Sequence, residues 1–232
     1  MIREFFFKIF FYLGVVLICL FFIPTLIMPK KVVSFGGKLL GYWAKFCLMV
    51  FMSTKITIKG SENIEKSDKF FIASTHQSQF ETYYLQALFD SPFFILKKEL
   101  IRIPIFGFFL QKIGCIAIER NKVSRNNLDF YERVKKSISK SNNPLIIFPQ
   151  GSRHDFKERP KFKKGVSRIY SLNIKCQPVV LNSGAVWPKN GAMKSNKELI
   201  ISILKPLETG LDEKMFLKQL QTSMYAELDR II

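Results

Sequence analysis

Histidine and cysteine, the residues most often used to bind metals or to act as nucleophiles, are scarce in this chain of 232 residues. There are two histidines and four cysteines, and no cysteine stands in a Cys-x-x-Cys pair or beside a histidine. Zinc sites and disulfide frameworks both need such spacings, so we expect neither. All four cysteines lie in apolar runs, which indicates buried thiols in a reducing compartment. These are Cys19, Cys47, Cys115 and Cys176.

Acidic residues are also few. The chain has 18 Asp and Glu against 36 Lys and Arg, which gives a formal net charge of +18. Such a charge predicts an anionic partner, and both nucleic acid and anionic lipid attract a basic protein through the same long-range field. Composition alone therefore leaves both partners open.

The N-terminal segment selects between them. Residues 9–28, IFFYLGVVLICLFFIPTLIM, carry no charge and are about long enough to cross a hydrocarbon core of roughly 30 Å as a helix. Bulky residues and lysines follow, where a cleavable signal would have small ones, so we expect a retained anchor. The sequence thus predicts a membrane lipid as partner and no nucleic acid. The competing interpretation is that this segment and the apolar segment that follows it are both ordinary core helices.

A second apolar segment, residues 38–52, is interrupted by Lys38 and Lys45. Such a helix suits the membrane interface better than the membrane interior, and Gly36 and Gly37 are predicted to form the turn before it. Lysines cluster after the anchor, which places the rest of the chain on the cytoplasmic face of an inner or plasma membrane. We predict two regions: membrane-anchoring helices in residues 1–53 and a globular domain in residues 54–232.

Short apolar strands alternate with helical segments after residue 53, a pattern typical of an α/β fold. The expected strands cover residues 55–60, 70–75, 93–98, 115–120, 145–149, 177–182 and 199–204. The expected helices cover residues 78–89, 104–113, 124–140, 164–172 and 212–230. Polar residues follow or close three of these strands, namely His76, Arg120 and the run Gln150 to Arg153. Open α/β sheets bind their ligands at such an edge, where we expect these side chains to meet.

The segment THQSQFE places Glu81 five residues after His76. A histidine titrates near neutrality and suits a general base, and a carboxylate on its other nitrogen would fix its tautomer. Ser78 and Glu81 have equally the spacing of a capping box that begins a helix. From spacing alone the two interpretations of Glu81 are evenly balanced.

Four blocks of the chain resemble the glycerolipid acyltransferase family. THQSQFET resembles its His-x4-Asp signature, and Lys97, Leu100, Gly107 and Arg120 follow its Lys-x2-Leu-x6-Gly-x12-Arg spacing. FPQGSR is similar to its Phe-Pro-Glu-Gly-Thr-Arg block, and QPVVLNSG to its last strand. The resemblance covers about residues 55–187. The sequence departs from the family pattern at three positions, with Glu81 for aspartate, Gln150 for glutamate and Ser152 for threonine.

The resemblance implies an α/β fold with a mixed central sheet flanked by helices, preceded here by an N-terminal membrane-associated helical hairpin. It implies acyl transfer from acyl-CoA or acyl carrier protein to the hydroxyl of lysophosphatidic acid, with no cofactor and no metal. The implied catalytic residues are His76 as base and Glu81 as its partner. The implied residues for a lysophospholipid acceptor are Lys97, Arg120, Gly151, Ser152 and Arg153.

Two alternatives stay open at this stage. The acceptor could instead be glycerol 3-phosphate or a lysolipid without phosphate, although three cations favour a phosphate. A basic membrane-surface or nucleic-acid-binding protein without catalysis would also explain the charge, but it leaves the ordered blocks unexplained. The second histidine, His154, lies in a polar loop and is predicted to be solvated rather than catalytic.

Overall fold

A computed structural model describes residues 1–67, 69–119 and 130–232. Within these residues seven strands form one sheet in the order β1-β7-β6-β2-β5-β3-β4. The strands are β1 (Lys55–Lys59), β2 (Phe70–Ser74), β3 (Phe93–Lys97), β4 (Ile116–Ile118), β5 (Leu145–Ile147), β6 (Lys175–Leu181) and β7 (Glu198–Ile203). All seven lie where the alternation of apolar segments predicts them, with ends that differ by a few residues.

The sheet is mixed. Strands β6, β2, β5, β3 and β4 run parallel to one another, while β7 pairs antiparallel with β6 and parallel with β1. Because parallel strands end at the same edge, the residues that follow β2, β5, β3 and β4 are brought to one side of the molecule. The predicted mixed α/β fold is confirmed.

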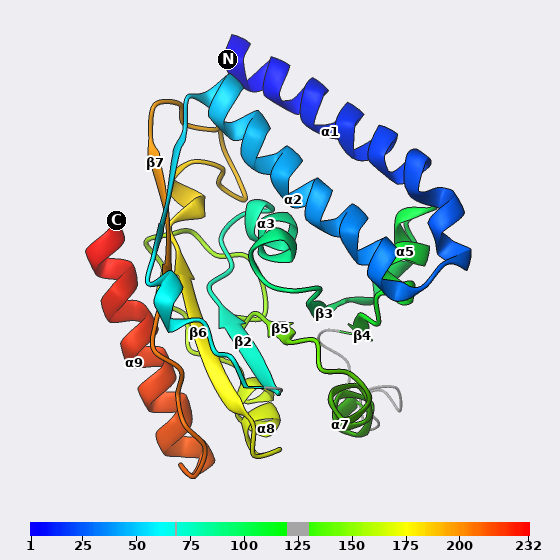
Figure 1. Cartoon of the computed structure of the whole chain (residues 1–232). Helices are drawn as coiled ribbons and strands as arrows, with labels where there is room; N and C mark the ends of the chain where they lie inside the picture. The colour runs from blue at the N-terminus through cyan, green and yellow to red at the C-terminus, as the bar shows by residue number, and fades with distance from the viewer. Residues whose placement is uncertain (68, 120–129) are drawn as a thin grey trace.

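Helices cover both faces of the sheet (Figure 1). They are α1 (Ile2–Phe22), α2 (Lys30–Met52), α3 (Phe80–Leu88), α4 (Lys98–Ile101), α5 (Phe106–Lys112), α7 (Phe130–Lys140), α8 (Gly165–Tyr170) and α9 (Glu213–Ile231), with 3-10 turns η1 (Ile23–Ile27), η2 (Ser61–Asn63) and η3 (Ser183–Ala185). Successive residues of a strand face opposite sides, so Ile72 packs in the apolar cluster beneath α2 and α3. Its neighbours Phe71 and Ala73 pack in the cluster beneath α8 and α9.

The N-terminal hairpin differs from its predicted boundaries. Helix α1 begins at Ile2 rather than at residue 9, and it includes Glu4 and Lys8, which form an i,i+4 ion pair of 2.8 Å. The turn predicted at Gly36 and Gly37 is wrong, because both residues lie inside α2. The chain turns instead at η1 and Pro29, whose ψ of 147° is outside the helical region. Gly36 serves packing, since a Cβ there would lie 2.7 Å from the Phe22 ring.

Helix α1, continued by η1, is the one helix within the described residues that is long and apolar enough to cross a membrane. Only 17% of its most apolar window is buried, which argues against an ordinary core helix. Large apolar side chains of both hairpin helices remain exposed, among them Phe5, Leu13, Phe21, Phe35, Phe46 and Val50. This exposed surface indicates association with a membrane.

The opposite side of the hairpin is continuous with the globular core. Phe7 and Phe11 are fully buried, and their rings meet Trp187 edge to face at 5.0 and 5.1 Å between centroids. Helix α2 lies against α3 so closely that a Cβ on Gly41 would be 2.7 Å from the Tyr83 carbonyl oxygen. The hairpin therefore covers the helix that follows the His76 segment. The division into two regions at residue 53 stays a prediction.

Candidate active site

The segment between β2 and α3 is buried although most of its residues are polar. The backbone N–H of His76 donates to Oε1 of Gln150 at 2.6 Å, and the His76 carbonyl accepts from the backbone N–H of His154 at 3.0 Å. Gln150 and His154 both belong to the β5–α8 loop, residues 148–164. The loops after two adjacent parallel strands, β2 and β5, are thereby fastened to each other at His76.

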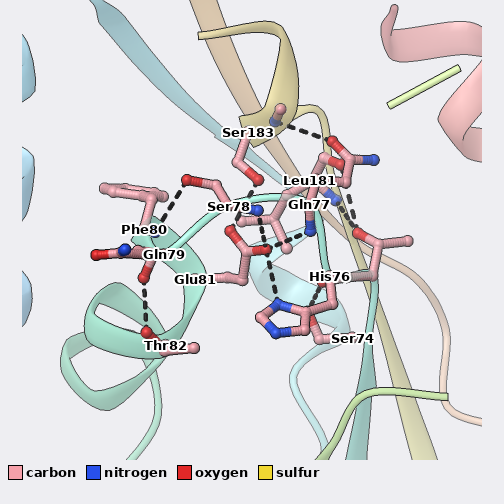
Figure 2. Close-up of polar contacts among 12 residues, drawn as sticks. Ser74, His76, Gln77, Ser78, Gln79, Phe80, Glu81, Thr82, Leu181 and Ser183 are labelled. Carbon is pink, nitrogen blue, oxygen red and sulfur yellow. Dashed lines mark hydrogen bonds and ion pairs between the residues drawn. The ribbon is translucent and has the colours of Figure 1, made fainter. Parts of the chain in front are cut away.

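The imidazole of His76 is held on two sides. It stacks on the Phe148 ring with 4.0 Å between centroids and 15° between planes. Its Nδ1 atom lies 3.1 Å from Oε1 of Glu81. Figure 2 shows the ring turned toward this carboxylate. About 10% of the His76 side chain is exposed, so the ring is largely desolvated but reaches the surface. Geometry of this kind fixes one ring nitrogen on the carboxylate and leaves proton transfer to the other.

Glu81 is completely buried and its carboxylate is surrounded by donors. Oxygen Oε1 accepts the backbone N–H groups of Gln77 at 2.5 Å and Ser78 at 2.7 Å, and Oε2 accepts the Ser183 hydroxyl at 2.8 Å. An ionised carboxylate only accepts hydrogen bonds, which suits this set of donors. The side chain is therefore locked in one orientation toward His76.

The contact with His76 that the catalytic interpretation of Glu81 needs and one half of a capping box occur in the same geometry. Glu81 reaches back to the Ser78 N–H as in a capping box, and Ser78 Oγ accepts the Phe80 N–H at 3.1 Å. Helix α3 begins at Phe80, two residues later than predicted. One carboxylate, that of Glu81, thus both accepts an N–H at the start of helix α3 and contacts the His76 ring.

Ser183 is a site residue that sequence reasoning missed. It follows β6, the neighbour of β2 on the side away from β5, and begins the turn η3. The next residue, Gly184, donates its N–H to Oε1 of Gln77 at 3.0 Å. The only sequence signal is its position just after the last apolar strand of the QPVVLNSG block.

Gly151 and Gln150 shape the β5–α8 loop. Gly151 has φ of +78°, which a residue with a side chain rarely adopts, and its N–H donates to the Phe148 carbonyl at 2.9 Å. A Cβ at Gly151 would lie 3.2 Å from Cγ of Lys163. Gln150 is 2% exposed, and its Nε2 has no hydrogen-bond partner among the described residues. The predicted glycine turn is present, and the amide of Gln150 supplies the acceptor for the His76 backbone.

The predicted cations lie at the same edge of the sheet, to the extent that the structure describes them. Arg153 is half-buried in the β5–α8 loop and has no ion pair or hydrogen bond with the described residues. Lys97 ends β3 and lies 3.2 Å from a carboxylate oxygen of Glu99, with about half of its side chain exposed. Arg120 lies outside the described residues. Within the described part of the chain, Arg153 therefore has no ion-pair partner, whereas Lys97 is paired with Glu99.

The structure corrects the prediction for His154. Its side chain is 25% exposed and is hydrogen-bonded at both ring nitrogens, to Ser152 and to Glu158. The loop folds back on itself between Asp155 and Glu158, which brings these partners to the ring. His154 is a built part of the loop and not a solvated side chain.

The described residues contain no group of three or more His, Cys, Asp and Glu side chains that could hold a metal ion. Burial raises the pKa of Cys115 to about 12 and that of Cys176 well above its usual value. Neither thiol has the lowered pKa of a reactive nucleophile.

Comparison with known proteins defines the class. A family model described as Acyltransferase matches residues 55–182, which is more than half of the chain. The chain belongs to this acyltransferase family.

Individual relatives are more specific. A 1-acyl-sn-glycerol-3-phosphate acyltransferase of Pseudomonas aeruginosa is 30% identical over 158 residues, which covers 66% of this chain and 60% of the relative. The enzyme of the same name from Saccharomyces cerevisiae is 28% identical over 168 residues, covering 70% and 54%. The chain thus matches little more than half the length of these relatives.

A solved structure shares the fold. The 1-acyl-sn-glycerophosphate (LPA) acyltransferase of Thermotoga maritima superposes with a TM-score of 0.79, with 99% of this chain and 96% of that chain covered, at 19% sequence identity. The superposition includes the N-terminal hairpin as well as the mixed sheet, because nearly the whole of both chains is aligned.

Proposed function

We propose that this protein transfers a fatty acyl group from a thioester to the free hydroxyl of lysophosphatidic acid, which gives phosphatidic acid. The observation that carries the proposal is the contact between His76 Nδ1 and the fully buried Glu81 carboxylate. Membership of the acyltransferase family and the names of the relatives support it. They also weigh against the alternative of a basic protein without catalysis.

The chemistry follows from the geometry of the pair. Nε2 of His76 takes the proton of the acceptor hydroxyl while the hydroxyl oxygen attacks the thioester carbonyl carbon. Glu81 keeps the imidazole oriented and stabilises it while it carries two protons. When the carbon–sulfur bond breaks, the leaving thiolate takes the proton from His76, and the ester oxygen stays with the acceptor. No covalent acyl-enzyme is required.

The phosphate of the acceptor would be bound by the cations of the same sheet edge. Guanidinium groups contact phosphate oxygens through two parallel hydrogen bonds, and Arg153 is unengaged within the described part of the chain. We assign Arg153, Lys97, Gly151 and Ser152 to this role, together with Arg120. This arrangement favours phosphate-bearing acceptors, both lysophosphatidic acid and glycerol 3-phosphate, over lysolipids without phosphate.

The exposed apolar face of the hairpin supports catalysis at a membrane surface. A lysophospholipid and its product both remain in the bilayer, so an enzyme docked there exchanges them by lateral diffusion without extraction into water. Acyl-CoA or acyl carrier protein would reach the site from the aqueous side. The lysines after the hairpin favour the cytoplasmic face of an inner or plasma membrane.

The test uses the purified full chain in detergent, labelled acyl-CoA and a panel of acceptors. The panel contains lysophosphatidic acid, glycerol 3-phosphate, lysophosphatidylcholine and monoacylglycerol. We expect transfer to lysophosphatidic acid, and we expect His76→Ala to abolish it while the folded fraction, measured by circular dichroism, is retained. Undiminished turnover by His76→Ala would refute the assignment of the base. No transfer by the unaltered protein to any phosphate-bearing acceptor would refute the acceptor class.

A further inference from the structure

The β5–α8 loop holds a second chain of hydrogen-bonded side chains, separate from His76 and Glu81. Ser152 Oγ lies 3.0 Å from His154 Nε2, and His154 Nδ1 lies 2.7 Å from Glu158 Oε2. A carboxylate only accepts hydrogen bonds, so Nδ1 carries a proton and Nε2 faces the serine hydroxyl. We call Ser152, His154 and Glu158 the loop relay. The family blocks include neither His154 nor Glu158.

The loop relay is anchored at both ends. At one end the N–H of His154 donates to the carbonyl of His76, the candidate base. At the other end Arg159 donates to the backbone carbonyl of Glu158 at 2.9 Å and forms an ion pair with Asp229 of α9. Because the backbone is fixed at both ends, less conformational entropy is lost when the side chains take up these contacts. The arrangement is a rigid feature of the site edge.

We propose that His154 and Glu158 are positioning residues that hold the Ser152 hydroxyl toward the phosphate monoester of the acyl acceptor. This inference rests on the proposed function. Ser152 stands between the Gly151 turn and Arg153, which is half-buried and has no ion pair or hydrogen bond with the described residues. A hydroxyl and a guanidinium on adjacent residues, in the loop whose His154 N–H donates to the His76 carbonyl, form a set of donors for phosphate oxygens.

The proton count explains why an imidazole suits this position. When both ring nitrogens of His154 carry protons, Nδ1 donates to Glu158 and Nε2 donates to the oxygen of Ser152. The serine then turns its own proton outward, where an anion accepts it. A bound phosphate favours this arrangement, because it interacts with an outward hydroxyl and with the positive charge behind it.

The same order of hydroxyl, imidazole and carboxylate also occurs where serine acts as a nucleophile. In that case Ser152 would attack the thioester carbonyl, His154 would take its proton, and the thiolate would leave with that proton. The phosphate interpretation is favoured because Ser152 is adjacent to an unengaged arginine within the described structure. Covalent acylation is an outcome that the test detects.

The experiment compares the full chain with His154→Ala and Glu158→Gln in mixed micelles, with labelled acyl-CoA as donor. Lysophosphatidic acid and monoacylglycerol are the two acceptors, which differ by the phosphate. We expect each variant to raise KM for lysophosphatidic acid about tenfold, as for a weakened hydrogen bond to a charged group. KM for acyl-CoA should stay within about twofold, and any transfer to monoacylglycerol should not change.

Asp155→Asn is the matched control. It makes the same change of charge in the same loop as Glu158→Gln, but the Asp155 carboxylate accepts the Lys157 N–H and is outside the loop relay. The Asp155 backbone carbonyl, which accepts the Glu158 N–H, is unchanged by the substitution. We expect its KM for lysophosphatidic acid to equal that of the unaltered protein. The double variant Ser152→Ala/His154→Ala should be no worse than Ser152→Ala alone, because both changes remove one contact.

Several results would overturn the proposed positioning role of the loop relay. They are a fall in kcat with KM unchanged, an equal effect of Asp155→Asn, additive effects in the double variant, and mass-spectrometric detection of acyl-Ser152. Both positioning variants could leave KM unchanged while the unaltered protein transfers normally to lysophosphatidic acid. This result would refute the role of the loop relay and leave the proposed function intact. Failure of the unaltered protein on every phosphate-bearing acceptor would remove both. Thermal melting in the same detergent identifies a variant that fails to fold. If His154→Ala does not fold, the KM of Glu158→Gln for lysophosphatidic acid decides whether the positioning role is correct.

Discussion

His76 Nδ1 lies 3.1 Å from Glu81 Oε1, and that oxygen also accepts two backbone N–H groups. Replacing Glu81 with Gln removes the charge that stabilises the protonated imidazole. We expect kcat to fall roughly 10²- to 10⁴-fold, the range of general acid–base catalysis, with little change in KM for lysophosphatidic acid. Steady-state kinetics with varied acceptor measures both. A higher KM for lysophosphatidic acid with an unchanged kcat would contradict the assigned role.

Glu81→Asp tests the departure from the usual aspartate. The Glu81 carboxylate contacts His76, Ser78 and Ser183 at once. Aspartate is one methylene shorter and would not reach all three. We expect Glu81→Asp to keep the charge but lose part of these contacts, with kcat between that of the unaltered protein and that of Glu81→Gln. A kcat as low as that of Glu81→Gln would show that reach matters more than charge.

Ser183→Ala tests the residue that holds the far side of the Glu81 carboxylate. Its hydroxyl donates to Oε2 at 2.8 Å, and both Ser183 and Glu81 are completely buried. Removing one donor from a buried charge costs about 1.5–3 kcal/mol. We expect lower thermal stability and a kcat reduced at least tenfold. Ser183→Thr keeps the hydroxyl and should restore part of the activity, whereas equal activity of Ser183→Ala and the unaltered protein would contradict the contact.

Gln150 tests whether a charge is needed at the position where the family has glutamate. Its Oε1 accepts the His76 N–H at 2.6 Å. Gln150→Glu preserves this oxygen, so we expect activity within about threefold of the unaltered protein, and Gln150→Ala, which leaves a buried N–H without an acceptor, should lose at least tenfold in kcat. If Gln150→Glu raised the activity by much more than threefold, a negative charge at this position would assist the reaction, contrary to our expectation.

The cysteines give a chemical test of a mechanism without a thiol nucleophile. Burial raises the pKa of Cys115 to about 12 and that of Cys176 well above its normal range. A raised pKa keeps the thiol protonated at all pH values below it, and the thiolate is the reactive form. We therefore expect N-ethylmaleimide at pH 7.5 to modify both residues slowly in the folded protein and rapidly in denaturant. Mass spectrometry of peptides, alongside residual activity, measures this.

Much of the fold is accessible from the sequence because apolar segments of five or six residues alternate with helical segments. The strand at 70–75 shows why, since FFIAS is apolar on both faces as a strand buried between two helical layers must be. The turn predicted at Gly36 and Gly37 is wrong because glycine is common in turns but is also used inside helices for close packing. In α2 glycine instead allows the Phe22 ring and the α3 backbone to approach, which is a tertiary reason that local sequence does not contain.

The candidate site was predicted in part for a similar reason. His76 and Glu81 are five residues apart, so one turn of chain brings them together, and their spacing carries the signal. Ser183 lies 102 residues from Glu81, and its contact exists only because β6 pairs with β2. The contacts of His154 depend on a fold in the β5–α8 loop that a polar composition does not specify.

The close packing of α2 against α3 connects the exposed face of the hairpin with the candidate site. Gly41 touches the Tyr83 backbone, Lys45 lies over the Tyr84 ring at 5.9 Å, and α3 carries Glu81 in its first turn. The exposed apolar surface of the hairpin and the carboxylate that we propose to orient His76 are thus separated by a single helical layer. If the proposed reaction takes place at a bilayer, we expect bilayer thickness and chain order to change kcat, and we expect a detergent used to extract the protein to do the same.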